Sequence, residues 1–159
     1  MRKQERKWRY KIAATKMPDV FTKAKRSQVM SRIRGRGNEE TELAIMRLFR
    51  RQGITGWRRH APIFGKPDFV FPKLKLAVFV DGCFWHRCPK HSNLPRNNRP
   101  FWKRKLESNV RRDRLVNPTL RNRGWSVLRV WQHELESRKE QRLLRRLQRA
   151  LTGSAASAN

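Results

Sequence analysis

Acidic residues are scarce in this sequence. Its 159 residues include 12 Asp and Glu against 40 Lys and Arg, which gives a formal net charge of +28 at pH 7. So large an excess of one sign exceeds what solubility requires and predicts a polyanionic partner. Nucleic acid, whose phosphates bind clustered Lys and Arg, is the partner class that we expect.

Long apolar runs are missing as well. No stretch approaches the roughly 18 consecutive apolar residues that a membrane-spanning helix needs. Residues 1–18 are basic and polar, without the apolar stretch of a secretory signal peptide. We therefore expect no membrane partner and place the protein in the cytoplasm, close to nucleic acid.

Cysteine is nearly absent, since only Cys83 and Cys88 occur. This excludes a secreted scaffold held by several disulfides, and in a cytosolic chain the close spacing favours metal ligation over a disulfide. Both cysteines lie in the segment DGCFWHRCPKH at residues 81–91, which also contains His91. Cysteine and histidine are typical zinc ligands, so this segment is a candidate zinc site.

The fourth zinc ligand is predicted to be His133. It follows the apolar segment WSVLRVW, and Cys83 follows the apolar segment LKLAVFVDG. If these segments are neighbouring strands, their carboxyl ends bring His133 next to Cys83. Cys83, Cys88, His91 and His133 then form a closed structural site, the alternative being that they are ordinary small or polar residues.

Hydrophobic patterning predicts the element order α-β-β-β-α-β-α. Asn38 is expected to cap a helix that ends at Gly53 and buries Leu43, Met46 and Phe49. A short helix is expected before it, from Ser27 to Gly35 or Gly37. Several paired strands are expected within residues 57–82, a strand over residues 125–131 and a basic amphipathic helix over residues 135–151.

The helix between these strands is expected to start at Phe101 and to stop where Asn117 precedes Pro118, because proline disrupts helix interiors. A second helical piece then ends at Gly124. Together the elements predict an α/β (α+β) fold with a mixed central sheet flanked by helices.

Residues 19–151 are expected to form one monomeric domain, because a chain of 159 residues is long enough for a single core. Residues 1–18 form a basic arm, which either adds affinity for phosphates or is only a solvated tail. The small polar residues at 152–159 predict a disordered tail.

Carboxylates at the ends of apolar segments are candidate ligands for a hard cation. Asp68 is expected at the start of a strand, Asp81 at the end of the next strand, and Glu42 on the preceding helix. Such oxygen donors could hold Mg²⁺, which assists the attack of water on a phosphodiester. The alternative for Asp68 is a plain turn residue after Pro67.

His86 lies between the expected zinc ligands without being required as one. A metal-braced loop would hold its imidazole rigidly, as a general base needs; a structural histidine is the alternative. Asp113 either orients His86 or only neutralises the arginines beside it, which are Arg111, Arg112 and Arg114.

Aromatic side chains on the same loop are candidates for contact with bases. Phe84 and Trp85 would be costly exposed surface unless a partner covers them, and Trp102 is a second candidate after the loop NNRP. Aromatic wedges unstack base pairs, most cheaply at a mismatch. We expect Phe101 to pack in the core, and Trp85 and Trp102 to serve as wedges.

Three segments together resemble the very short patch repair (Vsr) endonucleases, over about residues 19–147. They are GKPDFVFPKLKLAVFVDGCFWHRCPKH, FWKRKLESNVRRDR and GWSVLRVWQHEL. The resemblance implies a restriction-endonuclease-like fold. It also implies recognition of a T·G mismatch left by deamination of 5-methylcytosine, with Mg²⁺-dependent hydrolysis of the phosphodiester 5′ to the mismatched T.

The resemblance also implies roles for individual residues. Asp68 and the main-chain carbonyl of Val80 would ligate Mg²⁺, with Glu42 contacting the ion through water and Asp81 as an alternative direct ligand. His86 would be the general base and Asp113 its partner. Phe84, Trp85 and Trp102 would intercalate, and Cys83, Cys88, His91 and His133 would bind structural Zn²⁺.

Double-stranded DNA with a T·G mismatch is the partner that the resemblance implies, in a bacterial cytosol. Mismatch-repair proteins and a cognate cytosine-5 methyltransferase are further expected partners. One alternative is a zinc-stabilised nucleic-acid-binding protein without catalysis, and another is a related nuclease that cuts unmodified sites.

Overall fold

A mixed sheet of four strands lies at the centre of the part of the chain that the computed structural model describes, residues 38–156. The short helix expected from Ser27 and the basic arm lie outside these residues. The strands are β1 (Arg58–Arg59), β2 (Phe69–Phe71), β3 (Leu76–Asp81) and β4 (Ser126–Trp131), in this order across the sheet. The first two pairings are antiparallel and β3 pairs with β4 in parallel.

The parallel register of β3 and β4 places Asp81 beside Trp131. Both strands therefore end at the same edge of the sheet, and the residues that follow them, Cys83 and His133, start from this edge. The predicted neighbourhood of the two apolar segments is confirmed.

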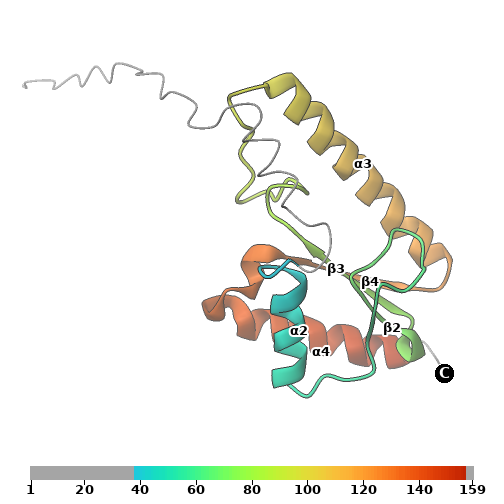
Figure 1. Cartoon of the computed structure of the whole chain (residues 1–159). Coiled ribbons are helices and arrows are strands. Elements are labelled where there is room, and N and C mark those ends of the chain that lie inside the picture. Colours follow the sequence, from blue (N-terminus) through green and yellow to red (C-terminus); the bar gives the residue numbers. More distant parts are fainter. Residues whose placement is uncertain (1–37, 157–159) are drawn as a thin grey trace, which may run out of the picture. The chain divides into compact units, whose positions relative to one another are not determined.

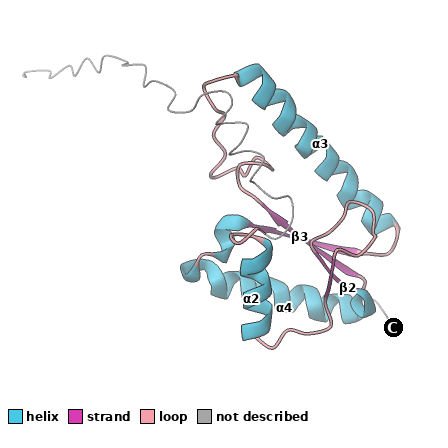
Figure 2. Cartoon of the chain, viewed as in Figure 1, coloured by secondary structure: helices cyan, strands magenta, loops and turns pink. Residues whose placement is uncertain are grey.

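The helices are α2 (Glu42–Arg51), α3 (Arg99–Asn122) and α4 (Glu140–Ala156), as Figure 1 shows. Short 3-10 segments occur at η1 (Pro72–Leu74), η2 (Gln132–Leu135) and η3 (Ser137–Lys139). The described elements follow the predicted order α-β-β-β-α-β-α, and the α+β class is confirmed (Figure 2).

Opposite faces of the sheet pack against different helices. Val78 and Val80 of β3 belong to a core with Phe49 of α2 and Leu147 of α4. The alternate residues of the same strand, Ala77 and Phe79, pack instead with Val116 and Leu120 of α3. Since side chains alternate along a strand, any residue in phase with Phe79 faces α3. Asp81 is one of them.

The first described helix begins later than expected, at Glu42. Asn38 caps the turn before it, because its Oδ1 accepts a hydrogen bond of 2.9 Å from the backbone N–H of Glu40. The buried face consists of Ile45, Leu48 and Phe49, which pack in the core against the sheet, while Leu43 and Met46 are half-buried. Gly53, with φ +62°, follows the end of the helix as predicted.

The expected break at Pro118 is wrong, because α3 is continuous from Arg99 to Asn122. Proline removes one backbone donor from the helix. The helix nevertheless continues because Val116 and Leu120, on either side of the proline, are buried against the sheet. The hydroxyl of Thr119 also donates a hydrogen bond of 2.7 Å to the carbonyl of Leu115.

Gly65 brings the loop before β2 against α3. Its φ is +78°, and a Cβ there would lie 2.4 Å from Cγ1 of Val116. Only glycine fits this close approach without displacing the helix. The contact fixes the loop that leads to Asp68, so α3 helps to position the start of β2.

The C-terminal helix lies later in the chain than expected. It begins at Glu140 instead of Leu135, after the 3-10 segments η2 and η3, and continues to Ala156, past the expected boundary at Leu151. It therefore includes part of the segment predicted to be a tail. Within the described residues, no helix is both long enough and apolar enough to cross a membrane.

Candidate active site and metal cluster

Asp68 lies immediately before β2, and its Oδ2 accepts a hydrogen bond of 2.7 Å from the backbone N–H of Val80. Burial raises the pKa of this carboxyl from 3.8 to about 6. The bond from Val80 opposes the rise, and the carboxylates of Glu42 and Asp81 add to it. A half-buried carboxyl among other carboxylates favours a bound cation, so the oxygen donors here fit Mg²⁺.

Glu42 is the first residue of α2 and is only 4% exposed. Its Oε2 lies 2.5 Å from Nη2 of Arg59 on β1. The structure thus places Glu42 close enough to Asp68 to raise the pKa of that carboxyl, while an arginine compensates its own charge. Arg59 was not singled out in the sequence, where it is one of many basic residues.

His86 and Asp113 are brought together from a loop and a helix. Nδ1 of His86 lies 2.6 Å from Oδ2 of Asp113 on α3. The loop that carries His86 is fixed by a hydrogen bond of 3.0 Å from Nδ2 of Asn109 to the carbonyl of Trp85. Of the alternatives for Asp113, the arrangement favours orientation of His86, since the nearest atoms of Arg112 lie 4.0 Å away.

The electrostatics of Asp113 support this pairing. Burial alone would raise the pKa of the carboxyl, but the hydrogen bond and charge of His86, together with Arg129, hold it below its ordinary value. Asp113 therefore stays ionised at neutral pH. An ionised partner on Nδ1 leaves Nε2 of His86 as the nitrogen that can accept a proton.

Arg129 occupies the carboxylate of Asp81. Its Nε lies 2.6 Å from Oδ2 and its Nη2 lies 2.9 Å from Oδ1, a forked ion pair beside the sheet. The pair uses one lone pair on each oxygen of Asp81 and compensates the charge of the carboxylate. Direct ligation of a metal by Asp81 stays a prediction.

Sequence reasoning missed Arg129. The signal was a lone arginine within the apolar strand WSVLRVW, in the register position beside Phe79 and therefore on the face that packs against α3. A charge at a buried strand position needs a partner, and here Asp81 and Asp113 supply it.

The predicted zinc ligands form one cluster. Candidate ligand atoms of Cys83, Cys88, His91 and His133 all lie within 4.8 Å of one another. Nδ1 of His133 is 3.2 Å from Sγ of Cys83 and 3.6 Å from Sγ of Cys88. Around a tetrahedral zinc ion such atoms are about 3.5 Å apart, so this donor set fits zinc.

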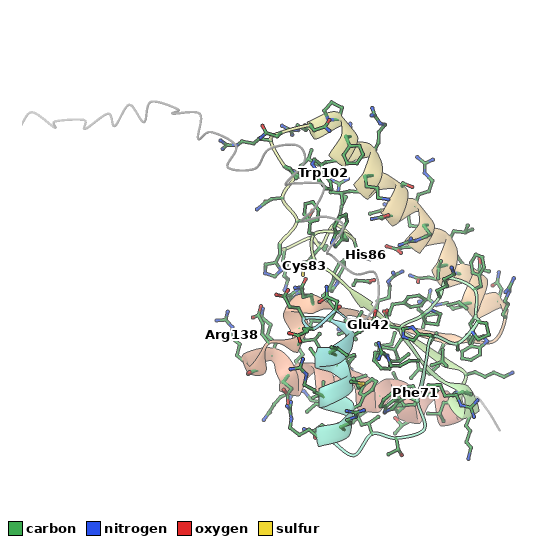
Figure 3. All side chains as sticks on the ribbon, in the orientation of Figure 1. Glu42, Phe71, Cys83, His86, Trp102 and Arg138 are labelled. Atoms are coloured by element: carbon green, nitrogen blue, oxygen red, sulfur yellow. The ribbon has the colours of Figure 1, made fainter. Side chains whose placement is uncertain are left out.

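The loop after β3 carries residues of both the Cys/His cluster and the pair of His86 with Asp113, as the positions of Cys83 and His86 show (Figure 3).

Within the Cys/His cluster, burial raises the pKa of the Cys83 thiol and lowers the pKa of His133. The lowered pKa keeps His133 neutral, the state in which histidine binds metal.

The aromatic residues form one group, with edge-to-face contacts between Phe84 and each of the two tryptophans. The ring of Phe84 lies 5.1 Å from that of Trp85 and 5.4 Å from that of Trp102, centroid to centroid. The expected difference between Phe101 and Trp102 is reversed: Phe101 is 45% exposed and Trp102 is 7% exposed. Trp102 is buried because Phe84 and Trp85 cover it, a contact that helix periodicity does not reveal.

Acidic residues beside a histidine and carboxylate pair, at the edge of a mixed sheet, are typical of metal-assisted hydrolases that act on phosphodiesters. A separate Cys/His cluster next to them is typical of a structural metal site.

Comparisons with known proteins identify the family. The family model of DNA mismatch endonuclease Vsr matches residues 18–92. DNA mismatch endonuclease Vsr of Escherichia coli (strain K12) is 36% identical over 148 residues, covering 89% of this chain and 93% of the relative. The chain belongs to the Vsr DNA mismatch endonuclease family, which confirms the resemblance noted in the sequence.

Other relatives are named as nicking enzymes. Type II nicking enzyme V.NmeDIP of Neisseria meningitidis serogroup C is 39% identical over 119 residues, with 74% of this chain and 80% of the relative covered. Type II nicking enzyme V.NaeI of Lentzea aerocolonigenes is 59% identical over 69 residues, but these cover only 43% of this chain and 42% of that protein.

Proposed function

We propose that this protein is an endonuclease that nicks double-stranded DNA at a T·G mismatch left by deamination of 5-methylcytosine. It hydrolyses the phosphodiester 5′ to the mismatched T and so initiates very short patch repair in the bacterial cytoplasm. Its membership of the Vsr family and the names of its relatives support an endonuclease acting on DNA.

The observation that carries the proposal is the proximity of a half-buried carboxyl, that of Asp68, to a histidine with an ionised partner. Asp68 has its pKa raised to about 6 by burial, and the charge of His86 is among the influences on it. A binding module without catalysis has no need of a buried carboxylate cluster, which weakens both the fold and the attraction for DNA.

In this mechanism Asp68, the main-chain carbonyl of Val80 and, through water, Glu42 would hold Mg²⁺, which would supply electrophilic assistance to the phosphodiester and the attacking water. Nε2 of His86 accepts the proton of the attacking water as the new bond forms at phosphorus. The bond from phosphorus to the leaving oxygen breaks, and that oxygen takes a proton from solvent. Asp113 stabilises the imidazolium through the 2.6 Å contact with Nδ1.

Mismatch recognition is assigned to the group of aromatic rings on and beside this loop. Phe84, Trp85 and Trp102 form one group with centroid separations of 5.1–6.0 Å. A preformed aromatic group inserts between bases most easily where pairing is weak, as at T·G. Because Trp102 is buried in the free protein, Trp85 and Phe84 make the first contact and Trp102 supports them.

Zinc bound by Cys83, Cys88, His91 and His133 has a structural role. The cluster fastens both ends of the loop that carries Phe84, Trp85 and His86. A loop fixed in this way keeps the histidine at a constant distance from Asp113, as general base catalysis requires.

Strand-resolved cleavage of labelled duplexes tests the proposal. The duplexes carry a T·G pair, the swapped G·T orientation or a matched pair, in varied flanking sequences, and are incubated with wild type or Asp68→Ala. We expect a nick 5′ to the T that requires Mg²⁺ and is absent with Asp68→Ala, while that variant still binds DNA.

Two other outcomes would reject the proposal. Tight binding without a nick in any sequence context would favour a zinc-stabilised nucleic-acid-binding protein. Equal cleavage of matched and mismatched duplexes would favour a nuclease of unmodified sites. Glu107→Ala, which removes an acidic residue of α3 outside the cluster, is the matched control for Asp68→Ala and should nick normally.

A further inference from the structure

Arg129 is central to a closed ring of four side chains at the edge of the sheet. Its Nη2 lies 2.9 Å from Oδ1 of Asp81 and 2.9 Å from Oδ1 of Asp113. The other oxygen of Asp113 contacts Nδ1 of His86, and that nitrogen lies 3.5 Å from Oδ1 of Asp81. The four residues come from β3, the following loop, α3 and β4, so no single element fixes their geometry.

The guanidinium is itself held on every side. Nη1 lies 3.1 Å from Oδ1 of Asn117 on α3, and the guanidinium carbon lies 4.9 Å from the ring centroid of Phe79. Its side chain is only 19% exposed. A planar group with bonds in several directions has one allowed orientation, so its partners are fixed as well.

Without this cation the ring would be unstable. Asp81 and Asp113 approach the same guanidinium nitrogen, and both carboxylates have side chains less than 20% exposed. Like charges this close and this poorly solvated repel each other. Each would then compete for Nδ1 of His86, which lies between them.

We propose that Arg129 is a positioning residue, which fixes Asp113 so that this carboxylate alone orients His86. The catalytic consequence rests on the proposed nicking activity. The arrangement of the imidazole does not, because it is a property of the protein without DNA.

Single-turnover nicking at saturating enzyme tests the catalytic consequence. Arg129→Met should lower the rate about 10- to 100-fold, as loss of a supporting contact around a site often does, with little change in the dissociation constant for DNA. Arg149→Met, which removes the same charge from an exposed position on α4, is the matched control and should keep the wild-type rate. A normal rate for Arg129→Met would overturn the proposal.

A second substitution separates the two ways in which Arg129 could act. If Arg129 orients Asp113, the double variant Arg129→Met with Asp81→Asn stays slow. If Arg129 only neutralises Asp81, removing that charge restores the wild-type rate, and the positioning role is wrong. Arg129→Lys keeps the positive charge but loses the two-nitrogen contact with Asp81, so it should also nick slowly. This variant replaces Arg129→Met in the rate measurement if the methionine variant does not fold.

Proton and nitrogen NMR of the zinc-loaded, full-length protein tests the positioning without any cleavage. The Nδ1 proton of His86, assigned through its loss in His86→Gln, should be protected from exchange in wild type and in Arg149→Met. It should shift or broaden in Arg129→Met. An unchanged resonance would overturn the inference even if the enzyme nicks DNA, and a wild type that fails to nick would reject only the proposed function.

Discussion

The loop after β3 joins two clusters that differ in how they are built. The Cys/His cluster takes Cys83, Cys88 and His91 from one short segment, and only His133 comes from elsewhere. The ring around Arg129 takes each of its members from a different element. The difference teaches that a Cys/His cluster can be predicted from local spacing, whereas the geometry of the proposed catalytic site depends on strand register and helix placement.

The two clusters also differ in whether the residues beside them can accept a further cation. In the Cys/His cluster all the candidate ligands face one another, as in a closed structural site. Beside the ring, Asp68 is a half-buried carboxyl with a pKa of about 6, which favours an additional cation. We therefore expect damage to the first cluster to affect stability most and damage to the second to affect catalysis most.

Loss of a zinc ligand should have the largest effect. His133→Asn is expected to abolish stoichiometric zinc binding and to lower the free energy of unfolding by several kcal/mol, as loss of a structural metal does. Zinc analysis and thermal unfolding measure this. His60→Asn is the matched control, because His60 is exposed and its φ of +54° suits asparagine. Equal zinc content in both variants would contradict the assignment.

The next largest effect is expected at the histidine pair. His86→Ala should lower the single-turnover rate about 10²- to 10⁴-fold, the usual contribution of general base catalysis. Asp113→Asn should lower it less, and the double variant should be no slower than His86→Ala, because the residues act as a unit. Strictly multiplicative losses would show that they act independently. Zinc content should stay normal in all these variants.

A smaller effect is expected among the aromatic residues. Trp102→Ala should lower the free energy of unfolding by about 3 to 5 kcal/mol, as truncation of a buried tryptophan does. Phe101→Ala should cost less than about 1 kcal/mol, because exposed side chains contribute little. Denaturant unfolding of both variants measures these losses in the free energy of unfolding. Equal losses would contradict the finding that Trp102 is buried and Phe101 exposed.

The smallest effect concerns the carboxyl of Asp68 before metal binds. The pKa of Asp68 is 3.8 when unfolded and about 6 when folded, a difference on the order of 3 kcal/mol. Because the folded state holds the proton more tightly, the stabilisation is complete below pH 4 and is lost as pH rises through 6. In Mg²⁺-free buffer Asp68→Asn should escape this loss. Identical pH dependence in both proteins would contradict the raised pKa.

Much of the sheet follows from the sequence because apolar runs and their flanking residues are local signals. The segments ending at Asp81 and Trp131 are strands, and they pair as expected. The same reasoning failed at Pro118, where local propensity predicts a break. Burial of Val116 and Leu120 against the sheet outweighs the missing backbone hydrogen bond.

In the candidate site, too, local signals predict some features and tertiary packing decides the others. Proximity of His133 to Cys83 follows from parallel strands, and the pairing of His86 with Asp113 was one of the open alternatives. Arg129 was not identified, because its role depends on which face of β4 meets α3. The exposures of Phe101 and Trp102 depend on how Phe84 and Trp85 fold over the helix, which no local pattern encodes.

The most direct test of the central claim is the response of the zinc-loaded protein to Mg²⁺ on a T·G duplex, followed strand by strand in single-turnover reactions. The account predicts binding without cleavage in Mg²⁺-free buffer and, once Mg²⁺ is added, a single nick 5′ to the mismatched T. A nick that forms equally well without Mg²⁺, or none at all in a protein that retains its zinc and binds the duplex, would contradict it.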